Sequence, residues 1–136
     1  MSRIIFLQCF QDQRSAGIPR EAVRQAFAPF LTELESDLWS VHYDPENSCT
    51  LFLEPFDAET IHQMTVRQPC EDLRLWDSLA VVLGLGNVIL YFPGLLRPLI
   101  REEAAEAHIP SALLQTLGIP LGVCNGHELR AAIESP

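Results

Sequence analysis

The spacing of apolar residues changes several times in the first third of the chain, and each change predicts a new element. Residues 2–10, SRIIFLQCF, are rich in β-branched and aromatic side chains and predict a strand. Pro19 stands where a helix can begin. The apolar residues that follow recur at helical spacing, at Val23, Phe27, Phe30, Leu31 and Leu34. Because an interior proline removes a backbone hydrogen bond, Pro29 predicts a kink or a break in this helix.

The next segments predict strands. Residues 38–43 and 49–53 are apolar and flank the sequence DPENS, which has the residues of a tight turn, so the pattern predicts an antiparallel hairpin. Residues 60–67, TIHQMTVR, allow two interpretations. Asp57 could cap a short helix here, but the β-branched residues of the segment favour a strand, and we expect the strand.

The second half of the chain alternates between helix and strand patterns. Cys70 or Asp72 caps a predicted helix whose apolar residues fall on one face: Leu73, Trp76, Leu79, Ala80 and Leu83. Gly84 and Gly86 are expected to end it in left-handed backbone conformations. Residues 88–92, VILYF, form a continuous apolar run, which is typical of a strand covered on both faces.

Shorter elements follow to the end of the chain. We expect an acidic helix at residues 102–107, a helix that begins at Pro110-Ser111 and ends at Gly118, a strand at 121–124 and a helix at 126–133. No repeat or linker divides the chain. The patterns therefore predict one globular α/β domain over residues 1–136, with a mixed β-sheet that contains an antiparallel hairpin and is packed by about four helices.

Charge narrows the class of partner. The chain has 18 acidic residues and 9 basic residues, all of them arginine, for a net charge of −9. This excess opposes binding to nucleic acid, where affinity comes mainly from cations that displace counterions. It suits a basic protein partner, because complementary charge accelerates encounter. We therefore expect a protein partner and no nucleic acid.

The sequence also bears on location. The N-terminal apolar run is short and lacks a small-residue cleavage site, so we expect no signal peptide, and no apolar stretch is long enough to cross a membrane. Cys9, Cys49, Cys70 and Cys124 are far apart and predict reduced thiols. These features predict a cytoplasmic protein, and they carry no signal of an oligomeric state.

Three short motifs suggest chemistry, and each has a simpler explanation. Gly84 and Gly86 resemble part of a dinucleotide fingerprint, but they follow a helix and precede a strand, the reverse of the required order. Cys124 and His127 have metal-ligand spacing without a second pair to complete a zinc site. Cys70, near a helix start, could be a nucleophile but lacks an evident histidine base. We expect no catalytic residue, no cofactor and no metal.

A resemblance to a known group of proteins supports a binding role. The run RQPCEDLRLWDSL…GNVILYFPG, followed by HIPSALLQTLGIPLGVCNGHEL, resembles small bacterial immunity-type proteins of contact-dependent, polymorphic or type VI toxin systems, mainly over residues 67–130. The resemblance implies a cytoplasmic, non-catalytic protein that binds and neutralises a cognate toxin, frequently a basic nuclease. The alternative is a small enzyme or ligand-binding domain with a pocket near Cys70.

Seven residues are candidates for the partner surface. An acidic surface can mimic the phosphate charge that a nuclease groove attracts, which favours the acidic turn and the acidic loop of the hairpin region: Asp44, Glu46, Glu54, Asp57 and Glu59. Trp39 and Tyr43 could anchor a partner through their aromatic rings. They lie an even step apart and so share one face of their strand, either the core face or an exposed one.

Overall fold

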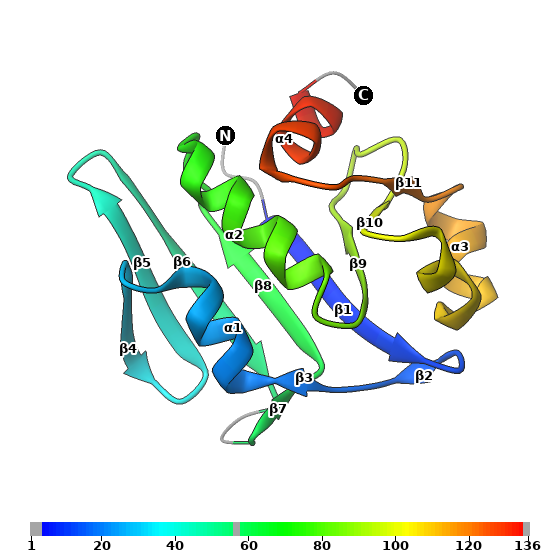
Figure 1. The fold of residues 1–136 in the computed structure, drawn as a ribbon, viewed down its shortest axis with the longest axis horizontal. Coiled ribbons are helices and arrows are strands. Elements are labelled where there is room, and N and C mark those ends of the chain that lie inside the picture. The colour runs from blue at the N-terminus through cyan, green and yellow to red at the C-terminus, as the bar shows by residue number, and fades with distance from the viewer. Residues whose placement is uncertain (1–3, 56–57, 135–136) are drawn as a thin grey trace.

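A computed structural model describes residues 4–55 and 58–134, which fold around one nine-stranded sheet (Figure 1). The strand order is β11-β10-β9-β1-β8-β6-β5-β4, and β2 pairs with the end of β1. The strands are β1 (Ile4–Gln11), β2 (Arg14–Ser15), β4 (Leu31–Glu35), β5 (Leu38–Asp44), β6 (Asn47–Glu54), β8 (Gln63–Arg67), β9 (Asn87–Tyr91), β10 (Leu99–Ile100) and β11 (Leu121–Gly122). A separate ladder joins β3 (Ile18–Pro19) and β7 (Thr60–Ile61).

Helices complete the single α/β domain that the sequence predicts. They are α1 (Arg20–Phe27), α2 (Leu73–Leu83), the 3₁₀ helix η1 (Glu103–His108), α3 (Ser111–Leu117) and α4 (Gly126–Glu134). The sheet is mixed because β10 and β11 run parallel while the other ladders, including the predicted β5–β6 hairpin, are antiparallel. The predicted fold class is therefore confirmed.

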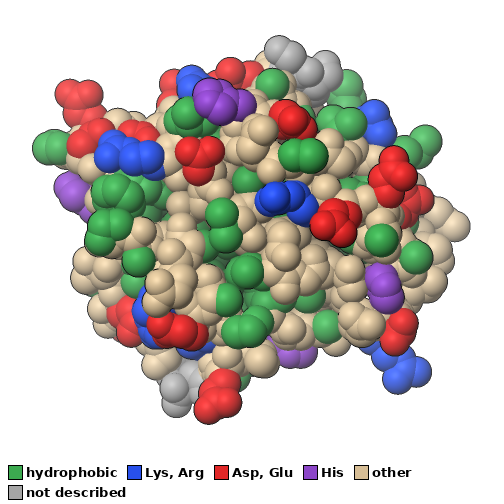
Figure 2. Space-filling view, viewed as in Figure 1, with side chains coloured by type: hydrophobic (Ala, Val, Ile, Leu, Met, Phe, Trp, Pro, Cys, Tyr) green, Lys and Arg blue, Asp and Glu red, His purple; other side chains and the backbone are tan. Residues whose placement is uncertain are grey.

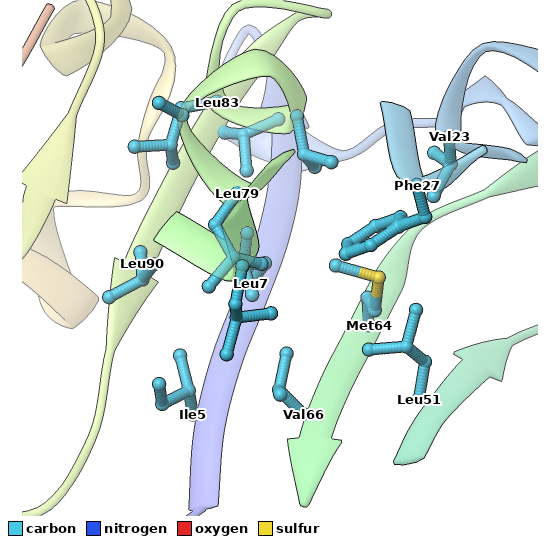
Figure 3. Close-up of a cluster of buried hydrophobic side chains, with 14 of the residues drawn as sticks. Ile5, Leu7, Val23, Phe27, Leu51, Met64, Val66, Leu79, Leu83 and Leu90 are labelled. Carbon is cyan, nitrogen blue, oxygen red and sulfur yellow. The ribbon is translucent and has the colours of Figure 1, made fainter. Parts of the chain in front are cut away.

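Strict alternation along four strands divides the sheet into two faces. Every second side chain of β1, β8, β6 and β5 is buried, and the side chains between them keep contact with solvent. The buried set faces α1 and α2, whose residues Val23, Phe27, Leu79 and Leu83 point toward it (Figure 3). This alternation is the pattern of an antiparallel sheet with one face packed and one face solvated.

A second, smaller core covers the other face at one edge of the sheet. Here Ile89 of β9 and Ile100 of β10 pack against Ala105 and Ile109 of the η1 segment. As a result Val88, Ile89 and Leu90 are all buried, which confirms the prediction of a strand covered on both faces.

Helix α1 is shorter than its apolar stripe predicts. It ends at Phe27, and Ala28 has extended backbone angles, φ −65° and ψ 147°, as expected of a residue before proline. Phe30 follows the helix, while Leu31 and Leu34 belong to β4. Pro29 therefore breaks the helix, and the helical spacing of the last three apolar residues is coincidental.

The structure distinguishes between the two residues predicted as the N-terminal cap of helix α2. The Asp72 carboxylate accepts a hydrogen bond from the backbone N–H of Arg74 at 2.8 Å, so Asp72 is the cap and Cys70 is not. At the other end, Gly84 has φ −88° and Gly86 also lacks a positive φ, so the prediction of left-handed glycines is wrong for both. The helix ends through tighter bonds from Gly84 and Leu85 to Val81 and Val82.

The remaining predictions differ mainly in boundaries. The predicted strand at 60–67 is two strands, β7 and β8, separated at His62. The predicted acidic helix is the 3₁₀ helix η1, and α3, β11 and α4 lie close to their predicted ranges. The two-residue turn between β1 and β2 was not predicted. Asp12 and Gln13 form it with φ values of 52° and 65°, as a type I′ hairpin requires.

Helices α2 and α4 approach closely at one glycine. Asn125 caps α4 by accepting a hydrogen bond from the Glu128 N–H at 2.9 Å, and this places Gly126 against Asp77 of α2. A Cβ atom at position 126 would lie 2.6 Å from the backbone nitrogen of Asp77 and 2.9 Å from its Cα. Backbone atoms cannot move aside as a flexible side chain can, so glycine is required here.

We predict that Gly126→Ala lowers the free energy of unfolding by about 1–3 kcal/mol, the range typical of overpacked positions. Gly84→Ala is the matched control, because its Cβ atom would meet its nearest neighbours at 3.5 Å, an ordinary contact. Urea denaturation of both variants measures the effect. Equal stability of Gly126→Ala and the wild type would show that α2 and α4 can separate at no cost.

Candidate functional site

The two predicted acidic segments lie at opposite ends of β6. Asp44 and Glu46 form the turn before β6, and Glu54 is its last residue (Figure 1). An eight-residue strand spans about 23 Å, at roughly 3.3 Å per residue. The two segments therefore do not form one continuous surface, and we consider each separately.

The Asp44 carboxylate has a structural role in its turn. It accepts hydrogen bonds from the Asn47 side chain at 3.0 Å and from the Glu46 N–H at 2.9 Å, and it pairs with the Arg74 guanidinium at 3.2 Å. The bond from Asn47 is the main cause that lowers the pKa of Asp44. Its charge is compensated within the fold, which leaves Glu46 as the exposed acid of this turn.

Trp39 and Tyr43 are in the core and not on a surface. Their side chains share a face of β5, as the even step predicts, and it is the face under the helices, where Trp39 is 0% and Tyr43 7% exposed. The guanidinium carbons of Arg20 and Arg24 lie 5.9 and 5.5 Å from the Trp39 ring centroid. Neither aromatic ring can anchor a partner from this position, so the partner-binding role predicted for them is corrected.

Arg20 contacts the β4–β5 turn and the β6–β7 loop, which lie at the end of the β5–β6 hairpin opposite the turn at residues 44–46. Its guanidinium donates hydrogen bonds to the carbonyl oxygens of Ser36, Pro55 and Ala58, and its backbone N–H donates to the backbone carbonyl oxygen of Glu59 at 2.8 Å. One planar cation thus holds the β4–β5 turn and the β6–β7 loop within reach of each other. Arginine suits this role because its donors are arranged as a rigid fork.

This clamp gathers carboxylates at one end of the molecule. Glu35 and Asp37 flank Ser36, while Glu54 and Glu59 flank the loop that Arg20 holds. We call these four residues the acidic end. None of them forms an ion pair with another residue in the described part of the chain. Asp57, the remaining predicted site residue, lies outside the described residues.

Neighbouring acids differ from the acidic end because they are neutralised. Glu33 accepts a hydrogen bond from Arg24 Nε at 2.8 Å, and Glu21 also pairs with Arg24. Figure 2 shows acidic side chains spread over the helical face, with acidic and arginine side chains together at the lower edge of the view. Glu35, Glu54 and Glu59 are exposed, and Asp37 is half-buried. The acidic end is therefore a surface of accessible negative charge.

Cys70 does not have the properties of a nucleophile. It is half-buried and lies before the cap of α2, and burial raises the pKa of its thiol. Burial also raises the pKa of Cys49 to about 12. A raised pKa keeps a thiol protonated, whereas the thiolate is the nucleophile. This geometry does not favour the alternative of an active site near Cys70.

The structure brings together one polar pair that the sequence does not reveal. Ser15 Oγ lies 2.8 Å from His62 Nδ1, beside an open hollow of about 350 Å³ that is also lined by Gln8, Glu54 and Gln63. In the described residues no carboxylate bonds to the other ring nitrogen of His62, as one does in a catalytic triad. No motif marks the pair, because 47 positions separate its members in the sequence.

The other candidate ligands stay apart. Cys124 and His127 are both exposed. Within residues 4–55 and 58–134 no group of three or more His, Cys, Asp or Glu side chains is arranged to hold a metal ion. None of the helices in these ranges has the length and hydropathy needed to span a membrane.

Comparisons of the chain with protein-family models, with curated proteins and with solved structures give no match. The resemblance to immunity-type proteins therefore stays a prediction, and the functional argument depends on the geometry of the acidic end.

We predict that Arg20→Lys lowers the free energy of unfolding by about 1–3 kcal/mol, because an ammonium group cannot reach three carbonyl groups that the guanidinium fork now satisfies. Arg14→Lys, at an exposed position of β2, is the control. Denaturant unfolding gives the stability, and hydrogen exchange gives the local effect. An unchanged exchange rate at Arg20 and its neighbours in the two loops would contradict the clamp.

We also predict that iodoacetamide modifies Cys124 before Cys70, and that Cys9 and Cys49 react only on unfolding, since they are buried. Peptide mass spectrometry after timed labelling measures the order of modification. Fastest labelling of Cys70 at neutral pH would revive the enzyme alternative.

Burial of Cys49 also makes stability depend on pH. Because folding raises the pKa of Cys49 from 9.0 to about 12, the stability that its protonated thiol contributes is complete below pH 9 and declines as the pH rises toward 12.

Proposed function

We propose that this protein is a non-catalytic binding protein of the cytoplasm that neutralises a basic protein partner, as immunity-type proteins do with a cognate toxin. One observation carries the proposal. Arg20 holds two loops so that the carboxylates of the acidic end, which form no ion pair within the described residues, lie around one end of the molecule. Such an arrangement adds a local concentration of accessible negative charge to the acidic side chains that are spread over the helical face.

A localised field has a direct effect on association. Complementary charge on two proteins raises the rate of encounter by one to three orders of magnitude at low ionic strength. A toxin that cleaves nucleic acid has a groove lined with cations, because it binds phosphates. Carboxylates brought together by the Arg20 contacts can occupy such a groove, and the inhibitor then blocks substrate without any chemistry of its own.

The net charge of −9 supports the same partner class and disfavours others. A phosphate backbone or an anionic membrane surface would be repelled at long range. A basic protein would be attracted, and the attraction would weaken as salt screens it over a Debye length of about 8 Å at physiological ionic strength. The proposed complex is therefore salt-sensitive in its rate of formation.

The test begins with capture of the partner from cells that express the chain naturally, followed by its purification. We predict that the triple variant Glu35→Gln, Glu54→Gln, Glu59→Gln associates with this partner about tenfold more slowly at low salt, because three exposed charges of the acidic end are removed. Surface plasmon resonance at several salt concentrations measures the rate and its salt dependence.

The matched control is Glu102→Gln, Glu103→Gln, Glu106→Gln, which changes the net charge equally at exposed positions in and beside η1. Its association rate should stay close to that of the wild type. Equal slowing of both variants would mean that only total charge matters, and no slowing in either would contradict an electrostatic interface.

A further inference from the structure

The outer face of β9, β1, β8, β6 and β5 carries a row of mostly apolar side chains. Strand register places Phe6 opposite both Tyr91 and Thr65, Thr65 opposite Phe52, and Phe52 opposite Leu38. The row Tyr91–Phe6–Thr65–Phe52–Leu38 therefore crosses five adjacent strands on one side of the sheet. We call it the cross-strand row. Each of its five side chains keeps partial contact with solvent.

Contacts within the sheet hold the aromatic members of the row in place. The rings of Phe6 and Tyr91 are stacked, with centroids 5.5 Å apart. The Tyr91 hydroxyl donates to Gln8 Oε1 at 2.9 Å, and the Gln8 amide donates to Gln63 at 3.1 Å. The Arg67 guanidinium lies 4.2 Å from the Phe52 ring centroid. Ordering these rings on binding therefore has a small entropic cost.

A row of this kind is unusual on a solvated face. An antiparallel sheet that is covered on one side ordinarily carries polar side chains on the other. Here polar positions lie on both sides of the row, at Gln8 and Gln63 toward one end of the strands and at Thr50 and Ser40 toward the other. Beyond the row on β1, Ile4 is 40% exposed and extends the apolar surface at this second side. An apolar centre with a polar margin is the anatomy of a protein–protein interface, where aromatic residues supply most of the binding energy.

The row also borders the acidic end. Glu54 follows Phe52 by two positions in β6, so both side chains are on the same face, and Leu38 directly follows Asp37. A cation that approaches Glu54 is therefore next to the row. Toward the other end of the strands the face carries the cation Arg67. The face is therefore negative at the Glu54 end and positive at the Arg67 end.

We infer that the cross-strand row is the apolar centre of the interface with the basic partner, and that the acidic end is its charged margin. This inference rests on the proposed function and adds the docking face to it. The occupant is a protein surface with an apolar patch beside a group of lysine or arginine side chains. A second copy of this chain is disfavoured because its own acidic end would repel the first, and a nucleic acid is disfavoured by its phosphates.

The experiment compares two double variants with the purified partner by calorimetry. Phe6→Thr, Phe52→Thr removes two rings of the row and keeps a β-branched residue in each strand. Val81→Thr, Ile119→Thr is the control, since these side chains are 48% and 73% exposed and lie outside the row. We expect the first variant to bind about 30-fold more weakly or worse, the loss typical of interface hot spots, and the control to bind like the wild type.

Footprinting of the wild-type protein keeps the test valid if the first variant unfolds. Hydroxyl radicals modify exposed aromatic side chains, so Phe6, Phe52 and Tyr91 should be protected in the complex. Modification that is unchanged by the partner would overturn the inference.

The other outcomes separate the two proposals. If no partner is captured, both fail. If the acidic-end variant loses affinity while Phe6→Thr, Phe52→Thr does not, the proposed function stands and the docking face is wrong. If the wild-type protein binds a short labelled single-stranded RNA or DNA and Phe6→Thr, Phe52→Thr does not, the row is a nucleic-acid site. A wild-type dimer in sedimentation that the same variant abolishes would assign it to a second copy.

Discussion

The alternation of buried and solvated side chains along β1, β8, β6 and β5 is the constraint on which the rest of the molecule depends. Because the side-chain period of a strand is two, a shift of one residue in register would move the whole apolar set to the wrong face. Burial of that set under α1 and α2 therefore fixes the register of every central strand. The same register places the cross-strand row on the other face. Strand register therefore determines both the core and the proposed docking face.

The acidic end depends on a different kind of interaction. Four carboxylates that are brought together repel one another, and a cation nearby offsets that repulsion. Arg20 supplies the cation but directs its donors to backbone carbonyl groups and not to the carboxylates themselves. These contacts hold Pro55 and Ala58 near Ser36 while the acids stay accessible. Arg24 and Arg74 show the contrast, because each pairs directly with carboxylates and so removes them from the accessible charge.

Local patterns predicted the elements well, and they failed where distant residues decide. The hairpin, α2 and the buried β9 follow from spacing and caps, which are properties of neighbouring residues. The position of Trp39 in the core and the Ser15–His62 pair depend on which elements adjoin, and no local signal contains that information. Helix α1 is an intermediate case: Pro29 marked the break, but the apolar residues beyond it continued the helical spacing by chance.

Charge and apolar contact have separate effects on the proposed complex. Electrostatic attraction acts at a distance and mainly sets the rate of encounter, whereas lifetime depends on contacts that exclude water. The acidic end alone would attract any basic protein, including many that the chain has no reason to bind. Since Glu54 and Phe52 lie on the same face of β6, a partner must place an apolar patch beside its cations to satisfy both. Specificity in this interpretation comes from that adjacency, which the pairing of β6 with β8 and of β8 with β1 creates.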